Sequence, residues 1–538
     1  MRRTFVELAL AASCGVAACN GCRPSQTPRD AAAAEKPTVR LYLVSDAAGA
    51  LEPCGCVKDQ LGGLDHVASL MLEEKKKTPD SVLVSAGPLF FLDPVIKSER
   101  QAQEKVKAET MADVFKGLDF VAFAPGRNDW ALGQGELSDL ATRSGGSVSA
   151  CNVAPPGGLF HASVMRTTAG IKVGFIGVAR PDKSDIGAPL GALAFEASAD
   201  AVKKEADALT AQGAQVLVAI AAVGRGEAKR IADVVPSLTA ILVGAVASNG
   251  EDNTTAPPPE MIGNVLVAET SNHLQTVGVL DLFVRNGSFV FHDAGNIALS
   301  EKRKELETRI DQLHAKIADW EKDPKIATGD LAARRADLAK LETQRKALDE
   351  APAPKEGSFF RYHVQEIRDS LGSDDSVKKQ FLAYYKKVDD MNRRDFADRV
   401  PPPPAPNGDA YAGIAACVPC HAAPKAVWDK TAHAHAYATL ATEFKEFNLD
   451  CVSCHVTGYE EPGGSSVTHV EKLKDVQCET CHGPSSRHVA DPKTVKVPIP
   501  RPGTDHCTTC HHPPHVHSFD ASAKLPEILG PGHGLPLQ

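Results

Sequence analysis

The sequence lacks two features that would define its class at once. It has no apolar run long enough to span a membrane beyond its N-terminal segment, which argues against a spanning helix. It also lacks a basic excess, because 59 Lys and Arg stand against 68 Asp and Glu, and this balance argues against nucleic acid as a partner. With 538 residues, 43% of them hydrophobic, the chain is long enough for roughly three globular domains.

The cysteine content is higher than an ordinary cytosolic enzyme needs, but lower than that of a small domain held together by disulfides. The chain has 14 Cys and 19 His, and their positions are uneven. Eight of the Cys and 13 of the His lie from Cys417 onward. This concentration predicts that the C-terminal part carries a chemistry of its own.

The N-terminus has the pattern of an export signal. Two arginines precede the apolar stretch Phe5 to Ala18, and Val16-Ala17-Ala18-Cys19 looks like a bacterial lipobox. The pattern predicts a periplasmic or cell-envelope protein with Cys19 as its lipidated first residue and a lipid anchor in a membrane. A plain secretory signal cut near the same place is the alternative.

Short apolar runs alternate with amphipathic stretches from Thr38 to about Ser300, which predicts an α/β domain with helices covering a sheet. Asn286-Gly287, between two apolar runs, is a hairpin signal. The expected strands are Val39 to Ser45, Ser81 to Ser85, Phe120 to Ala124, Val148 to Val153, Lys172 to Val178, Gln215 to Ala221 and Ala240 to Val243. The expected helices include Leu64 to Lys77, Ala102 to Lys116 and Ala199 to Ala211.

A heptad-like seam follows this domain. Apolar residues from Leu306 to Trp320 and from Leu331 to Leu348 keep coiled-coil spacing around a break at Asp323-Pro324, which predicts an antiparallel helical hairpin. Five prolines in six residues at Pro401 to Pro406 predict a stiff linker. The predicted division is 1–36 signal and tether, 37–299 α/β domain, 300–350 hairpin, 351–400 strand and helix, 401–412 linker, and 413–538 a mostly helical or irregular domain.

The last of these domains repeats C-x-x-C-H four times, a pattern in which two thiols reach the vinyl groups of one haem and the adjacent His binds its iron. Zinc sites or thioredoxin-like disulfides leave the His after every pair unexplained. The motifs therefore predict four covalent c-type haems. Their thioether residues are Cys417, Cys420, Cys451, Cys454, Cys478, Cys481, Cys507 and Cys510, and their proximal ligands are His421, His455, His482 and His511.

The residues around these motifs resemble the tetrahaem cytochrome c-554 family over roughly Gly413 to Ser518. The resemblance is carried by Trp428-Asp-Lys-Thr431-Ala-His433, by Val-Thr-Gly-Tyr459 after the second motif, and by His-Gly-Pro484 with Ser486-Arg-His488. It implies electron transfer through closely stacked haems, most of them ligated by two His, with His433 and His488 as distal ligands. Further candidates for distal ligands are His435, His469, His506, His512, His515, His517 and His533.

The α/β domain resembles the metallophosphoesterase fold of UshA-like 5'-nucleotidases, a family that holds two metal ions. The family's Asp-x-His is here Asp46-Ala47-Ala48, and its second Asp falls at or near Pro88. Its Gly-Asn-His is Gly126-Arg127-Asn128, and its Gly-His-x-His is Gly244-Ala245-Val246-Ala247. Because one or two carboxylates without an imidazole cannot hold two metal ions, the resemblance implies a scaffold without phosphoesterase activity.

Three thiols remain in this domain. Cys54-Gly55-Cys56 follows the first strand and Cys151 follows another, and both loops are expected at the sheet edge where ligands of open α/β sheets bind. Cys54, Cys56 and Cys151 are therefore candidates for a redox site, as a disulfide or a soft-metal site. Resemblance to UshA-like selenoproteins, which carry selenocysteine in such a motif, favours redox chemistry. A structural disulfide, with Cys151 a buried small residue, is the alternative.

The sequence thus predicts an exported multihaem cytochrome that exchanges electrons with redox proteins or quinol-linked cytochromes. A terminal reductase of a small oxidised nitrogen or sulfur compound, acting at an open haem or at the three thiols, is the first alternative. Hydrolysis of nucleotides or phosphate esters is the second.

Overall fold

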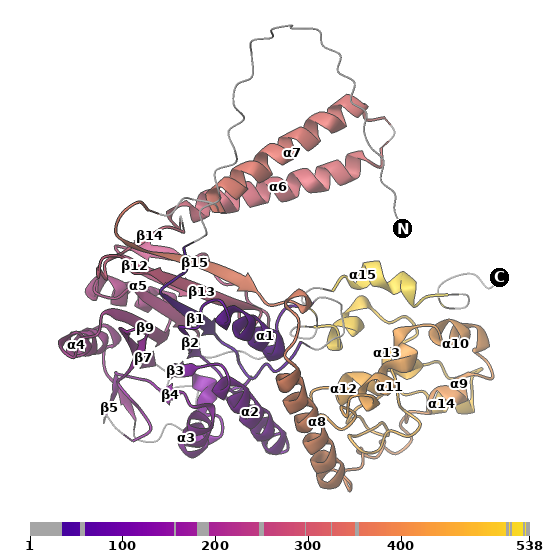
Figure 1. The fold of residues 1–538 in the computed structure, drawn as a ribbon. Helices are drawn as coiled ribbons and strands as arrows, with labels where there is room; N and C mark the ends of the chain where they lie inside the picture. Colours follow the sequence, from indigo (N-terminus) through magenta and orange to yellow (C-terminus); the bar gives the residue numbers. More distant parts are fainter. Residues whose placement is uncertain are drawn as a thin grey trace, which may run out of the picture. The chain divides into compact units, whose positions relative to one another are not determined.

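The computed structural model describes residues 35–53, 60–154, 158–179, 193–246, 252–295, 297–323, 325–349, 354–512, 516, 519–530 and 533. Pro37–Gln538 form one compact unit (Figure 1). Cys19, Cys54, Cys56, His515 and His517 lie outside the described residues, and the predictions made for them stay predictions. No helix in the described ranges has the length and apolar character needed to cross a membrane.

Two mixed sheets form the centre of the N-terminal part, which is of the expected α/β class. The first sheet has the order β14 (Phe291–Asp293), β15 (Ser358–Glu366), β13 (Thr276–Phe283), β1 (Val39–Ser45), β2 (Ser81–Gly87), β3 (Phe120–Pro125) and β4 (Ser147–Val148). The second has the order β11 (Glu260–Ile262), β12 (Val265–Glu269), β10 (Ala240–Gly244), β9 (Val216–Ala222), β7 (Ile171–Ala179) and β6 (Ser163–Thr168). A small pair is formed by β5 (Val153–Ala154) and β8 (Ala194–Phe195).

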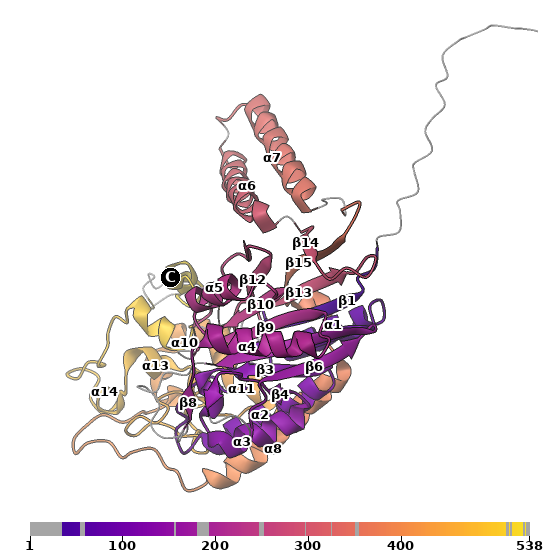
Figure 2. The ribbon, with the colours of Figure 1, turned by 90° about the vertical axis from the view of Figure 1, so that its left-hand side faces the viewer.

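The sheets pack face to face with helices on both outer sides (Figures 1 and 2). Successive residues of a strand pack on opposite faces of the sheet. In β1, Leu41 and Leu43 belong to the apolar cluster between the sheets, whereas Tyr42 belongs to the cluster beneath the helices. Both faces are covered, and this explains why the strands read as continuous apolar runs. On the first sheet lie α1 (Leu64–Lys75), α2 (Gln101–Lys116), α3 (Gly133–Ser144) and α8 (Asp375–Asp395), and on the second lie α4 (Ser198–Ala211) and α5 (Arg225–Val234).

Two expectations about strands were wrong. The turn at Asn286-Gly287 does have positive φ, but it does not join a hairpin, because β15 lies between β13 and β14 and pairs with both. Val148 to Val153 is not one strand. The backbone leaves the first sheet after β4, and the Cys151 amide bonds to the Gly177 carbonyl of β7 in the second sheet at 2.8 Å.

The predicted helical hairpin is present as α6 (Ser300–Trp320) and α7 (Thr328–Asp349), side by side in Figure 2. Ion pairs link Glu321 to Arg335 and Glu307 to Arg345, so the last turn of α6 meets the start of α7 and the start of α6 meets the end of α7. The helices are therefore antiparallel. Leu306 and Ile317 of the predicted seam are buried.

Short helices and irregular chain make up the C-terminal part. The α-helices are α9 (Ile414–Cys417), α10 (Ala422–Trp428), α11 (Ala436–Ala441), α12 (Val452–His455), α13 (Cys478–His482), α14 (Ser486–Ala490) and α15 (Ala521–Lys524). The 3-10 helices of the chain are η1 (Arg127–Trp130), η2 (Ile297–Leu299), η3 (Asp369–Leu371), η4 (Ala432–His435), η5 (Thr504–Thr509) and η6 (Leu525–Glu527). Apolar clusters here are small, such as Tyr437, Val452, Val456 and Val470, which is typical of a domain organised around a cofactor.

Candidate functional site

Each C-x-x-C-H motif forms a helical turn or part of one. In the first motif the His421 amide bonds to the Cys417 carbonyl at 2.9 Å, and in the fourth the His511 amide bonds to the Cys507 carbonyl at 2.9 Å. Residues three and four apart share one face of a helical turn. The turn therefore presents two thiols and one imidazole on the same side, as covalent haem attachment requires.

Three motif histidines each face a second imidazole from elsewhere in the chain. The ring centroids are 6.3 Å apart for His421 and His488, 6.2 Å for His511 and His433, and 5.9 Å for His482 and His533. A metal held at about 2 Å by two imidazole nitrogens separates the ring centres by roughly 6 Å, so each pair fits one iron between its rings. His433, His488 and His533 are all among the predicted distal ligands, but the sequence does not indicate which motif each of them faces.

Hydrogen bonds to the backbone determine which ring nitrogen of these histidines carries the hydrogen. The Nδ1 atom of His482 bonds to the Ile499 carbonyl at 2.8 Å, and that of His488 bonds to the Val495 carbonyl at 2.7 Å. The Nδ1 atom of His455 bonds to the Ala436 carbonyl at 2.5 Å. A carbonyl accepts only from N–H, so the hydrogen lies on Nδ1 and Nε2 keeps its lone pair for iron. Burial, together with the neighbouring His511, lowers the pKa of His433, which favours the neutral ring that binds metal.

The remaining candidates among the described histidines are placed differently. His435 uses Nε2 in a bond with the Asp429 carbonyl at 3.2 Å, and this occupies the nitrogen that iron would need. His469 Nδ1 lies 3.1 Å from the Thr468 hydroxyl and 3.3 Å from the Ser466 hydroxyl. His506 lies within η5, and the His512 carbonyl accepts a 3.1 Å bond from the Val516 amide, so both flank the fourth motif.

The thiols show which motifs are neighbours. Cys417 of the first motif lies beside Cys478 of the third, and Cys510 of the fourth lies beside Cys454 of the second. Cys481 of the third motif interacts electrostatically with both thiols of the fourth, Cys507 and Cys510. The motifs are therefore arranged in space as first, third, fourth and second.

Cys151, the one described thiol of the α/β part, lies in an apolar setting. It packs against the cluster between the second sheet and α4, and burial, with Glu205 and Glu196 nearby, raises its pKa to about 12. A thiol in this setting stays protonated at neutral pH and is a poor nucleophile. Its predicted convergence with Cys54 and Cys56 involves residues outside the described ranges.

At the sheet edge where the resemblance to phosphoesterases places metal ligands, the carboxyl groups of Asp46 and Asp129 are bonded to backbone amides. Asp46, at the end of β1, is buried and accepts a 2.8 Å bond from the Ala245 amide. A Cβ at Gly87, the position before Pro88, would lie 1.9 Å from the Asp46 Oδ1 atom. Burial, opposed by the Ala245 bond and helped by Glu269 and Asp129, raises the pKa of Asp46 to about 8. The carboxyl group is thus held as a buried, hydrogen-bonded group.

The third motif at this edge is also bonded to the backbone. Asp129 accepts bonds of 2.9 Å from the amides of Leu89, Phe90 and Gly126, and Asn128 donates to the Leu92 carbonyl at 2.6 Å. Across the described chain, no three His, Cys, Asp or Glu side chains come together as a metal-binding group.

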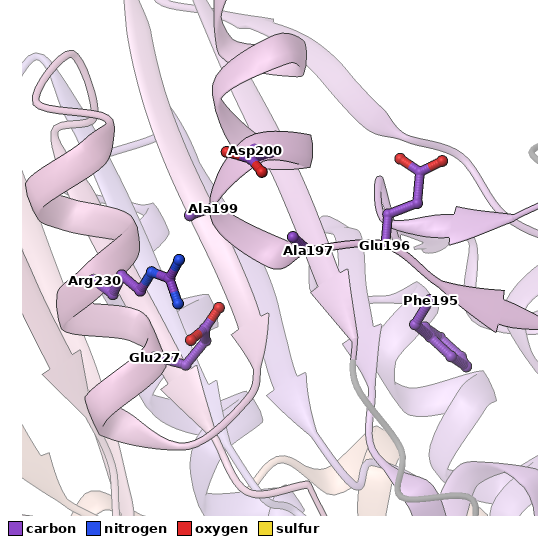
Figure 3. A pocket seen from close by; sticks show the side chains of 7 residues that line it. All are labelled: Phe195, Glu196, Ala197, Ala199, Asp200, Glu227 and Arg230. Carbon is purple, nitrogen blue, oxygen red and sulfur yellow. The ribbon is translucent and has the colours of Figure 1, made fainter.

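A separate cavity of about 340 Å³ lies between the start of α4 and α5 (Figure 3). Arg230 and Glu227 extend from α5, Asp200 lies on α4, and Phe195 and Glu196 complete the rim. Its walls carry three carboxylates and one guanidinium but neither histidine nor cysteine.

Solved structures similar to this chain include two phosphoesterases. A 5'-nucleotidase precursor from Thermus thermophilus is 17% identical with a TM-score of 0.45, covering 68% of this chain and 61% of that one. The calcineurin-like phosphoesterase YfkN from Bacillus subtilis is 17% identical with a TM-score of 0.38, covering 46% of this chain and 86% of that one.

The C-terminal part matches characterised cytochromes in sequence. Residues 416–483 match the family model for cytochrome c554 and c-prime. Cytochrome c-554 of Nitrosomonas europaea is 32% identical over a match that covers 15% of this chain and 41% of that protein, so the chain spans less than half of this relative's length. The chain therefore carries a cytochrome c554 domain at its C-terminus.

Proposed function

We propose that this chain is an exported electron carrier that holds four c-type haems, one at each C-x-x-C-H motif, beside an α/β scaffold that no longer hydrolyses phosphate esters. The observation that carries the proposal is the pairing of three motif histidines with three further imidazoles, 5.9 to 6.3 Å between ring centroids. At these three motifs two imidazoles would hold the iron, which suits electron transfer because no ligand position would remain for a substrate.

The residues of the domain have defined tasks in this proposal. Bound haem supplies one-electron cycling between Fe(III) and Fe(II). The two thiols of each motif would form the covalent attachment, and the paired imidazoles would hold the iron through Nε2, while Nδ1 of His482 and of His488 is bonded to the carbonyls of Ile499 and Val495. Because these bonds fix the ring orientation, little rearrangement of the protein is needed when the charge on the metal changes.

The spatial order of the motifs supports a continuous route. The first and third motifs are in contact through Cys417 and Cys478, and the fourth and second through Cys510 and Cys454. Cys481 links the two pairs. A redox partner could therefore deliver electrons at one end of the series, and another could accept them at the other end. Redox proteins or quinol-linked cytochromes are the proposed partners.

The cellular location follows from the same chemistry. A c-type cytochrome domain indicates a location outside the cytoplasm, and the lipobox at Val16-Ala17-Ala18-Cys19 supports the finer proposal of a lipid anchor at Cys19. Incubation with labelled fatty acid in a bacterial host would label the native chain and leave the Cys19→Ala variant unlabelled.

Two variants test the axial ligation. We expect His488→Ala to convert one low-spin haem of the chain to high spin in the electron paramagnetic resonance spectrum, because it removes the imidazole opposite His421. His435→Ala is the matched control, since its Nε2 is bonded to the Asp429 carbonyl, and it should leave the spectrum unchanged. An unchanged spectrum for His488→Ala, or a new high-spin signal for His435→Ala, would contradict the assignment.

A further inference from the structure

The second motif is joined to the α/β part by a packed junction, which we define as Phe447 to Asp450 together with Arg100, Gln103, Glu104 and Lys107 of α2 and Asn392 of α8. Figure 1 shows α2 and α8 beside each other. Gln103, Asn392 and Asn448 are almost completely buried there. The buried polar groups of this junction require hydrogen-bond partners, because an unpaired buried amide destabilises the fold.

Those partners are present. The Gln103 Oε1 atom accepts bonds of 2.9 Å from the Asn392 amide group and from the Leu449 backbone, and its Nε2 atom donates to the Asn448 Oδ1 atom at 3.2 Å. Asn392 also donates to the Phe447 carbonyl at 2.8 Å. This network fixes the backbone of the C-terminal part against two helices of the α/β part.

Charged groups complete the junction. Asp450 pairs with Arg100 and lies 3.2 Å from the Lys107 Nζ atom. Glu104 contacts the same two cations, at 2.8 Å for Lys107 and 3.2 Å for Arg100. Burial would raise the pKa of Asp450, but Lys107 and Arg100 outweigh it and lower this pKa to about 2, so Asp450 carries a negative charge beside the two cations at neutral pH.

This charged group directly precedes the second motif. Asp450 is followed by Cys451, and the Asn448 carbonyl accepts bonds from the amides of Cys451 at 3.1 Å and Val452 at 3.0 Å. The junction and α12 are therefore one continuous turn. Lys107 and Arg100 of the α/β part thus lie next to a haem-binding motif that belongs to another part of the chain.

A second ion pair supports the same alignment. Lys445 bonds to the Glu52 Oε1 atom at 2.5 Å, and the Tyr385 hydroxyl donates to the same oxygen at 2.8 Å. Glu52 belongs to the chain after β1 and Tyr385 to α8, so three segments meet. The second motif is consequently held from two directions by the α/β part.

We propose that Lys107 and Arg100 are positioning residues for the second motif, and that their charge balance with Asp450 sets the reduction potential of the haem bound at Cys451 and Cys454. The α/β scaffold thereby gains a role in electron transfer without catalysing a reaction. This inference rests on the proposed function, since it requires haem at the second motif.

The sign of the effect follows from electrostatics. Oxidation adds a positive charge to the iron, so an uncompensated Asp450 carboxylate favours the oxidised state and lowers the potential. Lys107→Met should therefore lower the potential of one of four components, and Asp450→Asn should raise that same component. The double variant should return it toward the native position, because one charge of each sign is removed.

Spectroelectrochemical titration of the full-length holoprotein tests this. Lys105→Met is the matched control: it removes the same charge from α2, but Lys105 pairs with Glu136 of α3. It should leave all four components in place, and Lys107→Arg should restore the native curve. If Lys107→Met and Asp450→Asn shifted the reduction potential in the same direction, the effect would come from lost packing. If both variants left the titration curve unchanged, there would be no electrostatic coupling. Either result would overturn the inference. Fewer than four haems in the native protein would refute the proposed function instead.

Discussion

The buried carboxyl of Asp46 gives a quantitative prediction for the α/β part. Burial raises its pKa from an ordinary 3.8 to about 8. Between pH 3.8 and about pH 8, Asp46 keeps its proton in the folded protein but loses it in the unfolded chain. The free energy of unfolding therefore falls as the pH rises through this window, and the loss is complete above about pH 8. Each pH unit in the window costs about 1.4 kcal/mol.

Asp46→Asn should remove this dependence, because the amide oxygen can still accept from the Ala245 backbone but cannot ionise. The variant should gain stability relative to the native protein by a few kcal/mol between about pH 5 and about pH 8. Asp129, whose pKa is raised to about 7 by burial, adds its own loss of stability in both proteins, and only its electrostatic coupling to Asp46 differs between them.

Urea unfolding followed by far-ultraviolet circular dichroism measures the effect. Ser45→Ala is a suitable control, since its hydroxyl donates to the Val243 carbonyl at 2.6 Å and has no charge to lose. Its cost, about 1 to 3 kcal/mol, should be the same at every pH. If the native and Asp46→Asn curves ran parallel across the window, the description of Asp46 as a buried, protonated group would be refuted.

Two further outcomes concern the lost and remaining chemistry of the α/β part. Cys151 should react slowly with iodoacetamide at neutral pH and become labelled only on unfolding, because burial raises its pKa to about 12; peptide mass spectrometry checks this, and rapid labelling of the folded protein would contradict it. Incubation with nucleotides and divalent cations should release no phosphate, since no metal-binding group exists among the described side chains; release that Asp46→Ala abolishes would show that the edge is active.

Local patterns were sufficient for much of the fold. β1 has the predicted bounds, and α1, α2 and β10 differ from prediction by a few residues at their ends, because each is a continuous apolar or amphipathic run between polar or glycine residues. The two wrong predictions, the hairpin at Asn286-Gly287 and the single strand from Val148 to Val153, have their cause in tertiary structure. In both places the backbone bonds to a strand that comes from a distant part of the sequence.

In the candidate site too, local features could be predicted from the sequence and contacts between distant segments could not. The C-x-x-C-H spacing is local, so the four motifs could be read directly, whereas the pairing of His482 with His533 depends on how distant turns pack. The junction at Gln103 and Asn448 gave no signal, because its members lie on separate segments and each looks like an ordinary surface residue in sequence. Asp450 beside Cys451 was the one hint available.

The most direct test of the account is the haem content of the purified full-length protein. A pyridine haemochrome spectrum, calibrated against protein concentration, should give four c-type haems per chain, one for each motif from Cys417 to His511. A content below four would contradict the central claim that every C-x-x-C-H motif binds haem.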